Sequence, residues 1–145
     1  MKVLEAMIRG AFVVDAGDSV RCASQMMAED DLGFLPVTDD DRIIGVLTDR
    51  DIVVRCVALG LSGNSRVGAI MTPRVYCCYE DENLDRVMEN MAEIQVRRMP
   101  VLTRKDRFVG VLSLADAART YSPDAVGAAF SGVVTPAPDL QLRLI

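Results

Sequence analysis

The sequence predicts an α/β (α+β) protein in which two β-α-β-β-α repeats pack as a pseudo-twofold pair. Three observations lead to this fold class. The chain has 145 residues, which is enough for one compact domain or for two small ones packed tightly together. Hydrophobic residues make up 50% of it and charged residues 26%, as in soluble globular proteins. The third observation is an internal repeat, which organises the whole chain.

The repeat becomes visible when the first half of the chain is laid on the second half with one inserted residue. The matching segments keep their order along the chain, which chance seldom produces. We therefore place the first repeat at residues 1–60, a linker at 61–66, the second repeat at 67–121 and a C-terminal tail at 122–145. The matches are Met7 with Met71, Met27-Ala28-Glu29 with Met91-Ala92-Glu93, Pro36-Val37 with Pro100-Val101, Gly45-Val46-Leu47 with Gly110-Val111-Leu112, Thr48 with Ser113, and Asp51 with Asp116.

The first repeat alternates strand and helix signals. Ser19 precedes an apolar stretch with helical spacing, and the acidic run at residues 39–41 separates two short apolar runs, as a hairpin turn does. Gly60 is placed to end the second helix. The predicted elements are a strand at Phe12–Val14, a helix from Ser19, strands at Phe34–Thr38 and Ile43–Leu47, and a helix from Thr48 to Gly60.

The second repeat shows the same order of elements. Asn83 can cap a helix whose apolar residues follow at i, i+3, i+4 and i+7, the spacing of one buried helical face. The residues of that face are Leu84, Val87, Met88 and Met91. The other predicted elements are a strand at Val75–Tyr79, strands at Met99–Thr103 and Arg107–Leu112, and a helix that begins near Ser113 and ends before Pro123.

A small β-α-β-β-α unit cannot cover both faces of its sheet alone, so two units should bury their exposed faces against each other. This packing predicts equivalent clefts between the copies. The first helices carry more apolar residues than one face of a small sheet needs. We expect part of that surface, with the second helices, to close a homodimer. The apolar residues concerned are Val20, Ala23, Met27, Leu84, Val87, Met88 and Met91.

The tail differs in composition from both repeats, because it is rich in Ala, Gly, Val and Pro. Residues Asp124–Phe130 can form one or two helical turns. We expect the remainder to be extended unless it docks on a partner subunit. Its end carries an extended apolar strip that could cover a groove, formed by Leu140, Leu142, Leu144 and Ile145.

Composition excludes several classes of function. The chain has no histidine, which removes Ser-His-Asp triads, HExxH zinc sites and histidine pH switches. Its net charge of −5 argues against nucleic acid as the main partner. No apolar run approaches the roughly 20 residues of a membrane span, so we expect a cytoplasmic protein with no membrane partner. None of Cys22, Cys56, Cys77 and Cys78 belongs to a CxxC pair, so we expect structural cysteines.

The strongest local motif is the segment Gly45–Asp51, which the segment Gly110–Asp116 repeats. A hydroxyl followed three residues later by an aspartate, at a strand-to-helix junction, is typical of a capping box. The same geometry offers a hydroxyl and helix N–H groups to a phosphate, and a carboxylate to the two hydroxyls of a ribose. The two interpretations are compatible, and local chemistry favours the cap.

The complete arrangement resembles tandem cystathionine-β-synthase (CBS) domains. The resemblance rests on the repeat, on Leu35-Pro36-Val37 and Met99-Pro100-Val101, and on the paired Gly-x-x-(Thr/Ser)-x-x-Asp motifs, and it covers nearly all of residues 3–121. The sequence is similar to stand-alone bacterial two-CBS proteins, including the hypoxic response protein group. This implies a non-catalytic regulatory module that binds an adenosyl ligand in the cleft between the copies and assembles as a homodimer. Candidate ligands are AMP, ADP, ATP, NAD and S-adenosylmethionine, with no obligatory cofactor and no metal.

The resemblance also implies roles for individual residues. Asp51 and Asp116 would hold ribose hydroxyls, and the hydroxyls of Thr48 and Ser113 would lie near the ribose or the phosphates. The strand residues Leu35 and Met99 would flank the base, as would residues near Val13 and Val75.

The two sites should be unequal. The hydroxyl of Thr72 has no counterpart in the first copy, where Ile8 stands. One of Arg97 and Arg98 is a candidate to reach a phosphate, and Arg50 is another; none of them has a basic counterpart in the other copy.

Two other functions stay open. The chain could be a regulatory subunit that binds another protein and retains vestigial nucleotide sites. It could also be an enzyme that uses aspartate or cysteine residues at the cleft. Equilibrium binding of adenine nucleotides separates the first alternative from the sensor, and turnover of a bound nucleotide would identify the enzyme.

Overall fold

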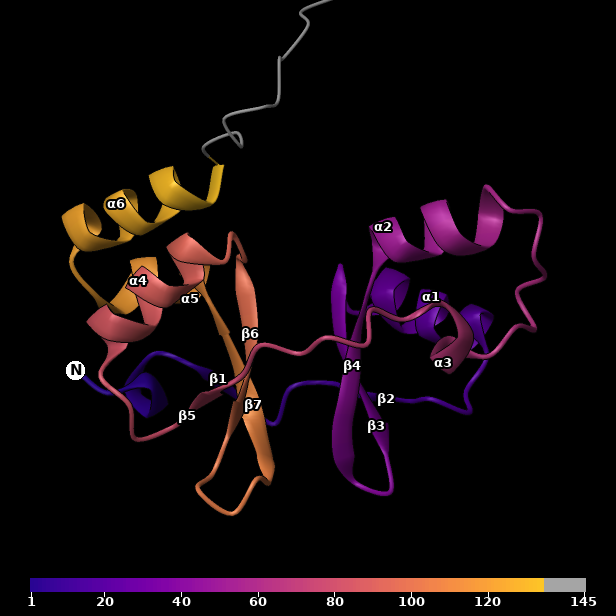
Figure 1. Cartoon of the computed structure of the whole chain (residues 1–145), viewed down its shortest axis with the longest axis horizontal. Helices are drawn as coiled ribbons and strands as arrows, with labels where there is room; N and C mark the ends of the chain where they lie inside the picture. Colours follow the sequence, from indigo (N-terminus) through magenta and orange to yellow (C-terminus); the bar gives the residue numbers. More distant parts are fainter. Residues whose placement is uncertain (135–145) are drawn as a thin grey trace, which may run out of the picture.

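The computed structural model describes residues 1–134 and consists of two halves, each a sheet with helices packed against it. Figure 1 shows the halves side by side, with the strands toward the middle and the helices toward the outside. One sheet has the order β2-β3-β4 and the other the order β1-β7-β6-β5. The chain is thus an α/β protein of two repeats, as the sequence predicts.

The first half is built around the antiparallel pair β3 and β4, with β2 parallel to β3. Its first helix begins at Ser19, whose hydroxyl accepts a hydrogen bond from the Cys22 N–H. The second helix continues from α2 through a π-helical turn at Val53–Val57. Gly60 follows with a φ of +71°, the left-handed conformation that ends helices. The bounds are β2 (Val14–Asp15), α1 (Val20–Glu29), β3 (Phe34–Asp39), β4 (Arg42–Thr48), α2 (Asp49–Ile52) and α3 (Val67–Ile70).

The second half repeats this plan. Asn83 caps α4 by accepting hydrogen bonds from the N–H groups of Asp85 and Arg86. All four apolar residues of the predicted helical face, from Leu84 to Met91, are buried in the core. The bounds are β5 (Cys78–Tyr79), α4 (Leu84–Glu93), β6 (Arg98–Leu102), β7 (Phe108–Ser113), α5 (Leu114–Thr120) and α6 (Pro123–Val134).

The segment that opens each repeat packs in the core of the other half. Val3, which begins a short 3-10 helix (Val3–Glu5), lies with Met7 in the core of the second half, and β1 (Ile8–Arg9) pairs with β7. Val67 lies in the core of the first half, where Thr72 bridges Val46 of β4. The sequence boundary of a repeat therefore differs from the boundary of a packing unit.

We call the entry segment of each repeat, which packs in the other half, the exchanged segment. At equivalent positions of the two halves, a glycine leaves room for it. A Cβ on Gly45 would lie 2.6 Å from the Met71 sulfur and 2.8 Å from the Thr72 carbonyl oxygen. A Cβ on Gly110 would overlap the carbonyl oxygen of Ile8. The first residue of the repeated motif thus leaves room for the backbone of the exchanged segment.

Both edge strands are shorter than predicted and begin later. Only Val14–Asp15 and Cys78–Tyr79 pair with their neighbours, in place of the expected Phe12–Val14 and Val75–Tyr79. The residues before them form the connections that cross between the halves (Figure 1). Local β propensity does not distinguish a crossing segment from a paired strand, because both are extended.

The C-terminal helix α6 is longer than the one or two turns expected at residues 124–130. Val126, Ala129 and Val133 are buried in the second core, and Gly132 lies against Ala92 of α4. The predicted apolar strip at residues 140–145 lies outside the described residues.

The helical surface that the sequence assigned to a homodimer is buried within the chain itself. Val20, Ala23, Leu84 and Met91 are each at most 2% exposed, so they cannot contact a partner. A group of exposed aliphatic residues lies instead on the second helix of the first repeat and just after it. We call them the aliphatic patch; they are Val53, Val54, Val57, Leu59 and Leu61.

No helix within residues 1–134 is both long enough and apolar enough to span a bilayer.

Candidate functional site

Two clefts lie where the halves meet, and the repeat relates them. The larger has a volume of about 710 Å³ and the smaller about 370 Å³. Phe34 of β3 and Arg98 of β6 line both. Six residues of the larger cleft have repeat-related counterparts that line the smaller cleft. Naming the residue of the larger cleft first, the pairs are Thr72 and Ile8, Arg74 and Gly10, Tyr76 and Phe12, Val96 and Leu32, Val46 and Val111, and Thr48 and Ser113.

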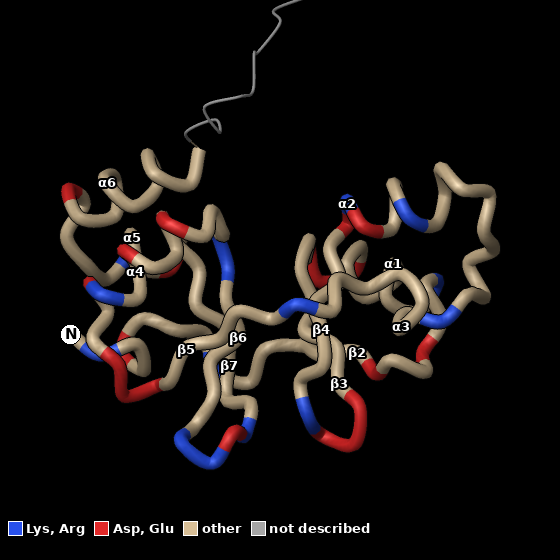
Figure 2. The backbone as a smooth tube through the Cα atoms, in the orientation of Figure 1, with Lys and Arg blue, Asp and Glu red and all other residues tan. Residues whose placement is uncertain are grey.

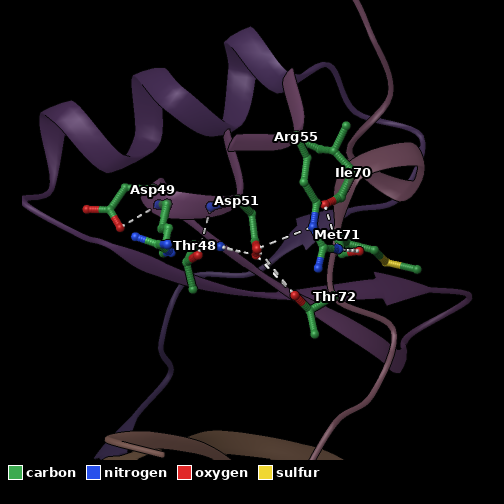
Figure 3. A network of polar contacts seen from close by, with 8 residues as sticks. Thr48, Asp49, Asp51, Arg55, Ile70, Met71 and Thr72 are labelled. Atoms are coloured by element: carbon green, nitrogen blue, oxygen red, sulfur yellow. Dashed lines mark hydrogen bonds and ion pairs between the residues drawn. The ribbon is translucent and has the colours of Figure 1, made fainter. Parts of the chain in front are cut away.

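The start of α2 forms one wall of the larger cleft and carries a complete capping box. The Thr48 hydroxyl oxygen accepts from the Asp51 N–H at 3.1 Å, and the Asp51 carboxylate accepts from the Thr48 N–H at 3.0 Å. These bonds are drawn in Figure 3. They confirm the capping interpretation and place a hydroxyl at the cleft, because Thr48 lines it.

The exchanged segment supplies the second hydroxyl. The Thr72 hydroxyl donates to both oxygens of Asp51 at 3.3 Å, and Thr72 lines the same cleft (Figure 3). Thr72 therefore acts with the motif of the first repeat, although it belongs to the second repeat in sequence. Asp51 lies behind the two threonines, with 13% of its side chain exposed.

Arg55 lies one helical turn after Asp51 and stabilises this arrangement. Its guanidinium donates to the carbonyl oxygen of Met71 at 3.0 Å and lies 3.9 Å from the Asp51 carboxylate (Figure 3). It ties the exchanged segment to the helix that carries Asp51. No local sequence signal marks Arg55, because its contacts join segments that only the exchange brings together.

The smaller cleft has the equivalent motif in a more buried setting. The Asp116 N–H donates to the Ser113 hydroxyl oxygen at 3.0 Å, and the Ser113 hydroxyl donates to the Asp116 carboxylate. Arg119 lies 3.2 Å from the same carboxylate. Because Ile8 occupies the place of Thr72, the described lining of this cleft lacks the second hydroxyl, and unequal binding by the two sites stays a prediction.

Most of the predicted site residues reach a cleft. Thr48, Arg50 and Thr72 line the larger one, and Ser113 and Asp116 line the smaller one. Arg98 lines both clefts, as described above, and Asp51 touches two residues of the larger lining.

Two of the four predicted positions beside the base need correction. Leu35 and Met99 are 0% and 3% exposed and belong to the two cores. Successive side chains on a strand point to opposite faces, so the preceding residues Phe34 and Arg98 face the clefts instead. Residues near Val13 and Val75 do line the clefts, but these are their neighbours Phe12, Arg74 and Tyr76.

The aromatic residues of the linings were not predicted individually. Phe12 and Tyr76 stand at matching positions of the two repeats and are 50% and 53% exposed. Aromatic side chains that recur at matching positions just before the edge strands are a sequence signal that could have found them.

The cysteines lie away from both linings. Cys77 is exposed and Cys78 buried, as expected for neighbours on a strand, and burial raises the pKa of Cys78 to about 12. A thiol with this pKa stays protonated at neutral pH and is a poor nucleophile. Within residues 1–134, no three His, Cys, Asp or Glu side chains form a group that could hold a metal ion.

Comparison with known proteins gives a consistent result. The family model of the CBS domain matches residues 3–57 and 67–122. Hypoxic response protein 1 of Mycobacterium tuberculosis is 34% identical over 134 residues, covering 91% of this chain and 93% of that protein. The crystal structure of Hypoxic Response Protein I with two coordinated zinc ions is 35% identical and covers 84% of this chain and 100% of that one, with a TM-score of 0.76. The crystal structure of CBSX2 in complex with AMP is 26% identical and covers 81% and 93%, with a TM-score of 0.71.

Proposed function

The chain belongs to the CBS domain family, and we propose that it is a non-catalytic regulatory module that binds an adenosyl ligand in the clefts between its two repeats. The observation that carries the proposal is that one arrangement occurs twice. Each cleft is lined by a hydroxyl at a helix start and an aromatic side chain from the crossing segment, and an aspartate three residues after the hydroxyl lines the smaller cleft (Asp116) or contacts the lining of the larger one (Asp51). A single capping box needs no cleft, whereas two equivalent clefts with the same groups are expected of a ligand site built by duplication.

The polar groups of each cleft suit a nucleoside. The Asp51 carboxylate accepts from Thr48 and Thr72 and can accept further hydrogen bonds from a ribose diol, because an ionised carboxylate has about four acceptor positions. The Thr48 hydroxyl uses its oxygen for the cap and keeps its hydrogen for a donor bond. Phe34 and Tyr76 offer flat apolar surfaces beside these groups, on which a purine can stack.

The relatives support the same class of ligand. The similarity to CBSX2, crystallised with AMP, makes adenine nucleotides the first candidates, with S-adenosylmethionine and NAD after them. The crystal structure of Hypoxic Response Protein I holds two coordinated zinc ions, and our proposal for this chain includes no metal. The described residues offer no group of three ligands, and the chain has no histidine.

We expect at least one of AMP, ADP, ATP, NAD and S-adenosylmethionine to raise the melting temperature of the full chain. A ligand at 100 times its dissociation constant adds about 2.7 kcal/mol to the free energy of unfolding, which is several degrees for a domain of this size. A thermal-shift titration measures this. Absence of stabilisation by all five at millimolar concentration would remove the adenosyl proposal.

A second candidate function is contact with a protein, either another copy of the chain or a regulated partner. The aliphatic patch favours it, because Val57 and Leu59 are 67% and 68% exposed within the single chain. Exposed aliphatic residues that follow one helix are typical of an interaction surface. We propose that this patch, which lies on one of the second helices named from the sequence, closes a homodimer without the buried residues of the first helices.

A single charge in the aliphatic patch should therefore prevent association. We expect Val57→Asp to turn a dimer into a monomer, because burying an unpaired carboxylate is costly. Val134→Asp places the same charge on α6, where Val134 is 45% exposed, and should leave the dimer intact. Sedimentation velocity at micromolar concentration distinguishes the states. A parent chain that sediments as a monomer, with and without nucleotide, would contradict the proposed dimer.

A further inference from the structure

We propose that the larger cleft selects a polyphosphate chain, so that its ligand is a nucleoside di- or triphosphate, whereas the smaller cleft has no such preference. This inference rests on the proposed function, because it names the class of adenosyl ligand that the larger cleft takes. It also implies that the larger cleft binds inorganic polyphosphate, which can be tested without adenosine.

The larger cleft is lined by four arginines, and all four are exposed. They come from three separate segments: Arg50 from α2, Arg74 from the crossing segment, and Arg98 from the start of β6 with Arg97 just before it. Figure 2 shows basic residues on the segment that crosses between the halves and beside β6. Asp49 is the one acidic residue among the described residues of this lining.

These positive charges are not neutralised within the part of the chain that the structure describes. None of the four arginines forms an ion pair in residues 1–134, where the ion pairs involve Arg55, Arg104 and Arg119. Arg97 lies over the ring of Phe130, 5.7 Å from its centre, a contact that leaves the guanidinium charged. Guanidinium groups around one cleft repel each other, and a polyanion among them removes that repulsion.

The smaller cleft serves as an internal comparison. The positions equivalent to Arg50, Arg74, Arg97 and Arg98 are Ala115, Gly10, Gly33 and Phe34, none of which is charged. Its own basic residues are Arg9 and the shared Arg98, and the buried Asp116 lines it too. Duplication alone does not concentrate arginine in one cleft, so the charge of the larger cleft is a property of that site.

Chemistry and size both favour a chain of phosphates. Guanidinium binds phosphate oxygens through paired, charge-assisted hydrogen bonds, and each group can serve a different phosphate. The larger cleft has nearly twice the volume of the smaller, about 710 against 370 Å³, which leaves space beyond a nucleoside. A cationic ligand such as S-adenosylmethionine would add to the repulsion among the arginines.

The test is isothermal titration of the full chain with adenosine, AMP, ADP, ATP and inorganic tripolyphosphate. Two variants remove charge from the cleft: Arg50→Ala, which introduces the residue found at the equivalent position, and Arg74→Gln. Arg107→Ala is the matched control, because it removes the same charge from the turn between β6 and β7, outside both linings.

We expect tripolyphosphate to bind, and ATP to bind at least about tenfold more tightly than AMP at low salt, with the difference shrinking as salt is added. Arg50→Ala and Arg74→Gln should each weaken ATP about tenfold and leave adenosine unchanged, while Arg107→Ala should bind ATP as the parent does.

The outcomes separate the two proposals. Equal affinity for adenosine and ATP, with no binding of tripolyphosphate, overturns the polyphosphate preference and leaves the adenosyl site standing. Binding of tripolyphosphate that depends on Arg50 and Arg74, without binding of any adenosine compound, supports the anion site and overturns the adenosyl function. Binding of neither overturns both, and a loss of ATP affinity in Arg107→Ala as large as in the cleft variants overturns the assignment to this cleft.

Discussion

Gly110→Ala is expected to lower the free energy of unfolding by about 1–3 kcal/mol, although alanine normally suits a strand better than glycine. The new Cβ would overlap the carbonyl oxygen of Ile8, which is backbone and cannot move without breaking the pairing of β1 with β7. Because the exchanged segment also carries Val3 and Met7 into the second core, any displacement of β1 disturbs buried packing. Chemical denaturation of the variant measures the loss.

Alanine substitutions at two other glycines provide comparisons for the stability loss of Gly110→Ala. Gly45→Ala meets the flexible side chain of Met71 as well as the backbone of Thr72, so its cost should be smaller than that of Gly110→Ala. Gly127→Ala on α6 meets nothing within 4 Å and should stabilise the chain by about 0.5–1 kcal/mol, the usual helical gain. If Gly110→Ala unfolds at the same denaturant concentration as the parent, the close approach of β1 does not constrain this fold.

Asp51→Asn is expected to weaken the binding of an adenosyl ligand in the larger cleft by about tenfold or more, and Asp116→Asn to do the same in the smaller cleft. Hydrogen bonds to a charged group contribute about 1.5–3 kcal/mol each, and asparagine keeps the shape while losing the charge. If the carboxylates act only as helix caps, each substitution should cost about 1 kcal/mol of stability or less and leave binding unchanged. Calorimetric titration together with melting temperatures distinguishes these results.

We expect the two substitutions to differ in their effects, because the two carboxylates have different contacts. The Asp51 carboxylate accepts hydrogen bonds from the backbone N–H of Thr48 and the hydroxyl of Thr72, and Arg55 lies beside it. The Asp116 carboxylate accepts from the Ser113 hydroxyl and from Arg119, which belong to the same strand-to-helix segment. Asp49→Asn is the matched control, because it removes the same charge from the same helical turn and lies in the same lining. If Asp51→Asn and Asp49→Asn change affinity equally, the effect is one of net charge and not of ribose recognition.

Local signals in the sequence were sufficient for the two helices of each repeat and for the central hairpins, but not for α3 or the full length of α6. Ser19 and Asn83 cap the helices as predicted, because capping depends on residues only three apart. The burial of Val87 and Met91 followed from helical periodicity. The capping boxes at Thr48 and Ser113 were likewise visible in the spacing of the motif, which is also why they did not by themselves identify a ligand site.

The sequence by itself determined the duplication, the family and the positions of the motif, because each is a matter of residue identity and spacing along the chain. Only the tertiary structure decided which segments meet. The exchange of the entry segments brings Thr72 to Asp51 and Ile8 to the second cleft, and it depends on the backbone space beside Gly45 and Gly110. The alternation of strand side chains placed Leu35 and Met99 in the cores and turned Phe34 and Arg98 toward the clefts. Such contacts join residues far apart in the chain, so no local preference encodes them, and they exist only once both halves have folded against each other.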